Sequence, residues 1–180
     1  MRWWDTIAET VEAEFSDVND LAQLTRIIVR LLLAALLGFA LGYEREHKGK
    51  AAGARTHMLV AIGSALFILV PQQSAMTPDG LTRVIQGLLA GVGFLCAGSI
   101  LKAGRDETQV TGLTTAAGLW TTAAIGLACG LGREVTAVIS TVLALVVLAL
   151  VPHFTRAVEM TIGAPKAPSN APPNTPDDRD

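Results

Sequence analysis

The stretch RIIVRLLLAALLGFALGY, residues 26–43, is apolar from its second residue to its last except for Arg30. Its length is close to the roughly 20 residues that a helix needs to cross about 30 Å of hydrocarbon. Four further stretches of this kind follow along the chain. The sequence therefore predicts five transmembrane helices, over residues 25–43, 56–72, 81–101, 111–131 and 135–151. We expect Pro71 to end the second helix and Pro152 to close the fifth, because proline interrupts helical hydrogen bonding.

The composition of the whole chain also indicates a membrane protein. Of its 180 residues, 51% are hydrophobic and 17% are charged, whereas a soluble domain carries about 25% charged residues. Helices are favoured over barrel strands, because the apolar stretches do not alternate with polar residues. The predicted fold class is an all-α membrane protein, a bundle of five transmembrane helices with short loops in the lipid bilayer. Nucleic-acid binding is not expected, because no extended basic stripe is present.

The positions of Lys and Arg predict the orientation of the bundle. These residues concentrate in the cytoplasmic loops of membrane proteins. Here they concentrate in the first and third loops, as Arg45, Lys48, Lys50, Arg55, Lys102 and Arg105. We therefore expect the N-terminus outside the cell and the C-terminus in the cytoplasm.

The two ends of the chain differ from the predicted membrane domain, residues 25–152. Residues 1–24 are acidic, and Trp4, Ile7 and Val11 recur at near-helical spacing opposite the carboxylates. This pattern predicts a short helix on the outer membrane interface, with an unstructured segment as the alternative. Residues 153–180 are rich in Pro, Asn and Asp, which predicts a disordered cytoplasmic tail.

Small residues predict which helices pack together, because close helix contact in a bilayer needs small side chains. The first, third and fourth predicted helices carry most of these residues, so we expect them to form the centre and the fifth to be peripheral. The predicted packing glycines are Gly38, Gly42, Gly87, Gly91, Gly93, Gly98, Gly112, Gly126 and Gly130. Such positions pack helices between chains as well as within one chain, so a homo-oligomer stays an open alternative.

The loop between the first two predicted helices is the main candidate site. Topology explains its lysines, but it does not explain the carboxylates interleaved with them. Thr56 can cap the second helix, and a positive group at a helix N-terminus favours an anion nearby, supplied by Glu44 or Glu46. We predict a closed polar network at the cytoplasmic end, with a solvated loop as the alternative. The candidate residues are Glu44, Arg45, Arg55, Thr56 and His57.

Weaker candidates lie in or beside the predicted helices: Arg30, Asp79, Arg83, Cys96, Thr114 and Thr115. Charged residues at membrane depth often have a functional role. Arg30 either extends to the outer headgroups or pairs inside the bundle, with Asp79 or Glu134 as its partner. No acidic residue lies at the centre of a predicted helix, which argues against a cation-coupled transporter.

The sequence contains no recognisable set of catalytic or metal-binding residues. His47, His57 and His153 stand alone rather than at metal-ligand spacing. Cys96 and Cys129 lie in apolar stretches, where a free packing residue is more typical than a disulfide. We therefore predict no enzyme activity, no cofactor and no metal site.

Four blocks at compatible spacing resemble the N-terminal membrane domain of the MgtC/SapB family. The blocks are RLLLAALLGFALGYERE (30–46), AGARTHMLVAIGSALF (52–67), GVGFLCAGSI (91–100) and TGLTTAAGLWTTAAIGLACGLG (111–132). The chain departs from the family pattern at Ala54, where leucine is common, and at Cys96, where glycine is common. Asp79 and Arg83 are similar to an acidic residue and arginine of many members. The soluble C-terminal domain of the larger members is not expected here, because a Pro-rich segment follows the fifth helix.

The resemblance implies a bacterial inner-membrane protein linked to magnesium limitation, acid stress and survival inside hosts. Some family members restrain other membrane machinery by binding to it. We therefore expect a non-enzymatic regulator or scaffold that contacts a membrane protein partner through its helices. The alternative is a channel or permease for a small solute or an ion, Mg²⁺ or the proton.

Overall fold

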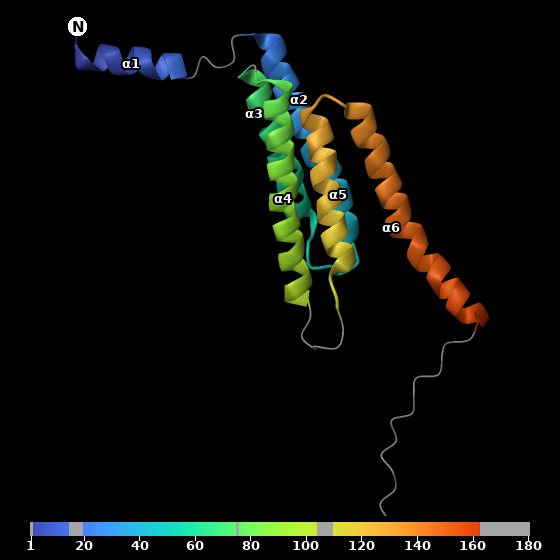
Figure 1. The fold of residues 1–180 in the computed structure, drawn as a ribbon. Coiled ribbons are helices and arrows are strands. Elements are labelled where there is room, and N and C mark those ends of the chain that lie inside the picture. Colours follow the sequence, from blue (N-terminus) through green and yellow to red (C-terminus); the bar gives the residue numbers. More distant parts are fainter. Residues whose placement is uncertain (1, 15–19, 75, 104–109, 163–180) are drawn as a thin grey trace, which may run out of the picture. The chain divides into compact units, whose positions relative to one another are not determined.

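The computed structural model describes residues 2–14, 20–74, 76–103 and 110–162. These residues form six α-helices and no strand (Figure 1). The helices are α1 (Trp3–Glu14), α2 (Leu21–His47), α3 (Ala54–Gln73), α4 (Pro78–Ala103), α5 (Leu113–Gly130) and α6 (Glu134–Ile162). Helices α2 to α6 are each long and apolar enough to cross a membrane. The predicted fold class is thereby confirmed.

Two prolines that we expected to end helices lie inside them instead. Helix α3 continues past Pro71 to Gln73, and α6 continues past Pro152 to Ile162. Proline removes one backbone donor, and that loss is small beside the remaining bonds of helices of 20 and 29 residues. The first ten residues of the predicted disordered tail, 153–162, are therefore helical, and residues 163–180 lie outside the described part of the chain.

Local signals in the sequence define the ends of the first two membrane helices. The Asp20 side chain caps α2 by accepting a hydrogen bond from the Ala22 amide, at 3.1 Å. After α2 ends, Gly49 adopts φ +64°, a left-handed conformation that glycine adopts without steric cost. Gly53 then provides the N-cap residue of α3. A tight connection between α2 and α3 results.

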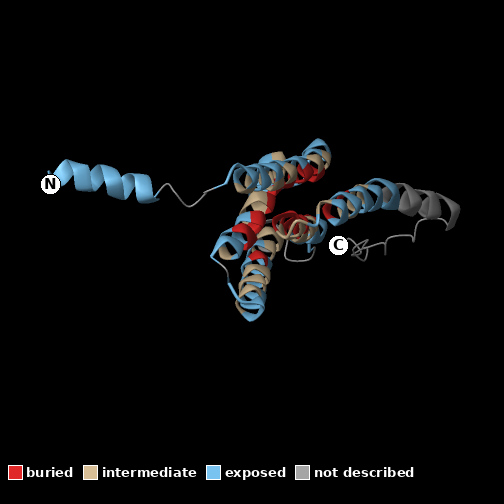
Figure 2. Ribbon diagram, turned by 90° about the horizontal axis from the view of Figure 1, so that it is seen from above, coloured by how far each residue is buried: buried red, intermediate tan, exposed pale blue. Residues whose placement is uncertain are grey.

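The packed centre of the bundle contains α2, α3 and α5. Helix α3 contacts α2, α4 and α5, and α5 also contacts α2 and α4. Fully buried side chains gather along these helices, among them Ala34, Ala61, Ala65, Ile68 and Cys129 (Figure 2). The second predicted helix therefore belongs to the centre, and our assignment of the third to that place was wrong. Helix α3 packs through alanines rather than glycines, and the glycine count did not reveal them.

Four of the predicted packing glycines lie at close helix contacts. A Cβ atom added at Gly38, Gly42, Gly126 or Gly130 would come within 3.0 Å of backbone atoms of α3 or of its N-cap residue. Small residues allow helix backbones to approach this closely in a bilayer.

The remaining predicted packing glycines have other surroundings. No described atom of another helix lies within 4 Å of a Cβ placed at Gly87, Gly91, Gly93 or Gly98, so the close helix contacts expected for them within the chain are not found. Gly112 is the N-cap residue of α5 with φ +89° and shapes a turn. The chain also divides into two units, residues 1–146 and 147–180, and the described part of the second is the continuation of α6.

Candidate functional site

A cluster of charged side chains lies where α2 ends and α3 begins. We call Glu44, Arg45, Lys48 and His57 the hairpin cluster. The Glu44 carboxylate forms ion pairs with the Arg45 guanidinium and with the Lys48 ammonium group, the latter at 2.6 Å. The Arg45 side chain is only 3% exposed. A buried charge is tolerated when it is paired and hydrogen-bonded. Glu44 provides both interactions for the Arg45 guanidinium.

His57 lies in the first turn of α3 and is fully buried. Its Nδ1 is 3.0 Å from the Gly53 carbonyl oxygen, so the neutral ring carries its proton on Nδ1 and donates it there. Its Nε2 is then an acceptor, and it has no hydrogen-bond partner among the described residues. Gly118 of α5 lies beside the ring, and a Cβ at that glycine would be in ordinary van der Waals contact with Nε2, at 3.5 Å.

The cap of α3 comes from α2 and not from Thr56. A Glu46 carboxylate oxygen accepts a hydrogen bond from the Ala54 amide at 2.9 Å. The charge is also favourable there, because a helix N-terminus is partly positive. The N-cap residue is Gly53 and Thr56 already lies inside the first turn of α3, so the predicted cap was wrong.

Arg55 also lies outside the predicted network. It is exposed, and no hydrogen bond or ion pair is found for it in the described part of the chain. Glu44 and Arg45 therefore pair with each other, and His57 lies near enough to feel both charges but forms no hydrogen bond with either in the described part of the chain, whereas Arg55 and Thr56 face a different surface. Lys48 completes the cluster, and its i,i+4 spacing from Glu44 is a signal that sequence reasoning could have used.

Arg30 forms a second polar junction, toward the other end of α2. Its Nη1 donates to the Gln72 side-chain oxygen at 3.2 Å and to the Gly130 carbonyl at 3.0 Å. Its Nε lies 3.7 Å from a carboxylate oxygen of Glu134. Of the two predicted partners, the structure brings Glu134 to Arg30. The Arg30 junction thereby joins α2, α3, α5 and the start of α6.

The other predicted candidates are not brought into one site. Asp79, Arg83 and Thr114 are exposed, and no ion pair joins Asp79 to Arg83 among the described residues. Thr115 is buried in α5. The Cys96 thiol donates to the Ala116 carbonyl at 3.1 Å, so it links α4 to α5.

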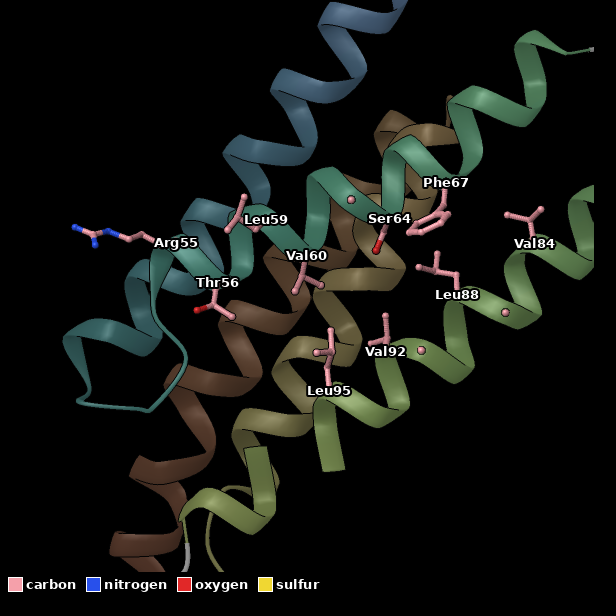
Figure 3. Close-up of a pocket in the computed structure, with 13 residues that line it drawn as sticks. Arg55, Thr56, Leu59, Val60, Ser64, Phe67, Val84, Leu88, Val92 and Leu95 are labelled. Atoms are coloured by element: carbon pink, nitrogen blue, oxygen red, sulfur yellow. The ribbon is translucent and has the colours of Figure 1, made fainter. Parts of the chain in front are cut away.

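A long apolar groove lies between α3 and α4. Its main part has a volume of about 810 Å³, and a further hollow of about 400 Å³ shares Gly63, Phe67 and Val84 with it. In Figure 3, Val60 and Phe67 of α3 face Val84, Leu88 and Leu95 of α4 across this α3–α4 groove. Leu59, Gly63, Gly87 and Gly91 also line it.

The α3–α4 groove has one polar end. Arg55 and Thr56 lie there, and the guanidinium of Arg55 extends away from α4 (Figure 3). Sequence reasoning missed this groove, because it assigned the glycines of α4 to contacts within the bundle. A groove lined by apolar side chains and by glycine backbone suits binding rather than catalysis. Among the described residues, no group of three His, Cys, Asp or Glu side chains could hold a metal ion.

Known proteins share much of this sequence. The profile of the MgtC family matches residues 31–157. Protein SrpB of Synechococcus elongatus is 46% identical over 131 residues, which cover 66% of this chain and 71% of that protein. Protein MgtC of Salmonella typhimurium strain LT2 is 45% identical over 120 residues, which cover 66% of this chain and 49% of that protein.

A third relative carries a transporter name. The Escherichia coli K12 protein named "Putative magnesium transporter YhiD" is 41% identical over 128 residues, 67% of this chain and 58% of that protein. The chain thus spans about half the length of MgtC, and no solved structure matches it. Because the family profile covers most of the chain, including all five membrane helices at least in part, this multi-pass membrane protein belongs to the MgtC family.

Proposed function

We propose that this chain is a non-enzymatic regulator or scaffold that binds a transmembrane helix of another membrane protein in the α3–α4 groove. The observation that carries the proposal is the groove itself, which opens sideways from the bundle and is lined almost entirely by apolar atoms. We further propose a bacterial inner-membrane location with the N-terminus outside, as the loop charges predict. The link to magnesium limitation, acid stress and intracellular survival rests on the family.

The length of the α3–α4 groove suits a helix. Its lining on α3 runs from Arg55 to Pro71, and 16 residues at helical rise correspond to about 24 Å. That length covers most of the roughly 30 Å of hydrocarbon in a bilayer. A helix in the groove would meet apolar side chains at nearly every depth.

The glycines of the groove supply the contact that helix association needs. In lipid, helices gain little from burying apolar surface and associate by close packing at small residues. Gly87 and Gly91 lie one turn apart on α4, and neither has a described atom of another helix within 4 Å of its Cβ position. A ridge of the partner helix can therefore approach the α4 backbone. Arg55, at the polar end, would pair with an acidic residue next to the partner helix.

A permease is the second candidate, because the relative YhiD is named as a putative magnesium transporter. Mg²⁺ sites use carboxylates and retained waters. The buried groups that can carry a charge in the described residues are Arg45 and His57, both near one end of the bundle. Both are basic side chains, which do not favour a path for Mg²⁺.

Site-specific photocrosslinking tests the proposal. A photoreactive residue at Leu88, in the groove, should join to a discrete membrane protein, and one at Leu32, exposed on α2, should not. Gly91→Leu should abolish the adduct by filling the groove. Gly93→Leu is the matched control, because Gly93 has equally open surroundings but does not line the groove. Adducts with lipid alone at Leu88 would contradict the proposal.

A flux measurement separates the two candidate functions. Purified protein in sealed liposomes should pass Mg²⁺ and protons no faster than empty vesicles do. If flux rises well above that background and Gly93→Leu retains it, the permease becomes the better description.

A further inference from the structure

A separate polar hollow of about 410 Å³ lies where α2 begins and α3 ends. Its polar lining consists of Asp20, Gln23, Arg26, Arg30, Gln72 and Gln73, with two aliphatic side chains beside them. It shares no residue with the hairpin cluster or the α3–α4 groove. An inference from it is therefore independent of the proposed function.

Arg30 lines this hollow, and its side chain is held in place by the protein. Its guanidinium donates to Gln72 and to the Gly130 carbonyl and lies beside Glu134. Glu134 offsets its charge, so Arg30 is already committed to the protein. The ligand-binding capacity of the hollow comes from the other side chains.

Arg26 is the uncommitted cation of the hollow. It is exposed, one turn before Arg30 on α2, and no hydrogen bond or ion pair is found for it among the described residues. The planar guanidinium of arginine suits two oxygens of a phosphate group. The amide groups of Gln23 and Gln73 line the same hollow and can donate further hydrogen bonds.

Asp20 supplies a negative charge in the same hollow. Its Oδ1 accepts from the Ala22 amide as the cap of α2, and this cap does not use the second carboxylate oxygen. With Arg30 offset by Glu134, the free charges of the lining are one cation and one anion. A ligand that carries a phosphate and an amine matches both.

The depth of the hollow corresponds to lipid headgroups. Helix α2 has 27 residues, or about 40 Å at helical rise, close to the roughly 40–45 Å of a bilayer with its headgroups. Arg26 is five residues from the start of α2, which places its Cα about 7.5 Å along the helix. That depth is close to the boundary between the headgroups and the hydrocarbon.

We propose that this hollow binds the zwitterionic headgroup of a phospholipid, with the phosphate on Arg26 and the ammonium group on Asp20. The Gln23 and Gln73 amides hold the phosphate oxygens, and the acyl chains lie against the apolar surface of the helices. A free phosphate ion shares part of this chemistry but lacks the ammonium group and the chains.

Lipid titration of the delipidated full chain, followed by native mass spectrometry, tests this proposal. The protein should bind phosphatidylethanolamine more tightly than phosphatidylglycerol or phosphatidylcholine. Arg26→Gln should weaken binding of both phosphatidylethanolamine and phosphatidylglycerol about tenfold, as expected for a lost charge-assisted hydrogen bond. Asp20→Asn should weaken only phosphatidylethanolamine, about threefold, because asparagine still caps the helix.

Arg83→Gln is the matched control, because Arg83 is exposed near the start of α4 and does not line the hollow. It should leave lipid binding unchanged, and circular dichroism should show equal helix content in all variants. An equal loss in Arg83→Gln, or an unaltered lipid preference in Asp20→Asn, would overturn the proposal. Displacement of the lipid by millimolar inorganic phosphate would instead identify a site for the free ion.

Discussion

Arg45 places a full charge in the packed part of the bundle, where α2 meets α3. Its guanidinium is tolerated there because Glu44 pairs with it and Lys48 balances the same carboxylate. Near this group lies His57, whose Nε2 has no partner in the described part of the chain. A substitution of a single residue in this cluster is therefore expected to lower the stability of the protein, because it leaves a buried charge without its partner.

We expect Glu44→Gln to lower stability by about 2 kcal/mol. Removing one partner of a fully buried pair costs about 3–5 kcal/mol, and the glutamine oxygen still accepts one hydrogen bond. The measurement is the thermal unfolding midpoint of the purified protein in detergent. Lys50→Gln is the control, since Lys50 is exposed in the same connection. Equal midpoints for the two variants would show that the Glu44 ion pairs contribute little.

At the scale of the helices, α3 organises the bundle because α2 and α5 approach its backbone at glycines. The contact at Gly126 is especially close, since a Cβ atom there would overlap the backbone of Ala61. Gly130 and Gly38 make similar approaches to α3 one or more turns away. These contacts position the α3 wall of the groove and the buried ring of His57.

Gly126→Ala should therefore destabilise the bundle by about 1–3 kcal/mol or more, because overpacking forces the two backbones apart. Gly93→Ala offers the contrast, since its Cβ would meet open space. That substitution should keep or slightly raise stability, because alanine favours helix over glycine. Resistance to unfolding by SDS, followed by circular dichroism, measures both. A loss at Gly93 as large as that at Gly126 would contradict the helix packing described here.

For the membrane domain as a whole, the charged and amide side chains gather toward two ends. The hairpin cluster lies where α2 ends, and the Arg30 junction and the polar hollow lie where α2 begins. Between them, Ala34, Ala61 and Ala123 are among the residues that fill the interior. This distribution suits a protein whose binding surfaces face its ends and the surrounding lipid.

The predicted orientation has a direct test in intact cells. In a variant without Cys96 and Cys129, a cysteine introduced at Lys50 should be protected from a membrane-impermeant maleimide. A cysteine at Thr77, in the next connection, should react. Permeabilised cells provide the control, because both positions are exposed and should then be labelled. If only the cysteine at position 50 were labelled in intact cells, the orientation would be the opposite of the predicted one.

The five membrane helices and the polar connection between the first two could be read directly from the amino acids. Each of these features depends on local quantities, because the length of an apolar stretch and the charge of a loop are summed along the chain. Arg30 was also recognisable as an exception inside an apolar stretch, and Glu134 was one of two partners that its position allowed.

The faces on which the helices meet could not be read in the same way. Lipid is as apolar as the buried side chains, so hydrophobicity does not distinguish the packed side of a membrane helix from its exposed side. The glycines of α2 and α5 contact α3, whereas Gly87 and Gly91 of α4, which carries more glycines than either helix, line an open groove. Arg55 likewise faces outward although its neighbour His57 is buried. The rotation of each helix about its own axis is set by its neighbours, and only their packing against one another determines it.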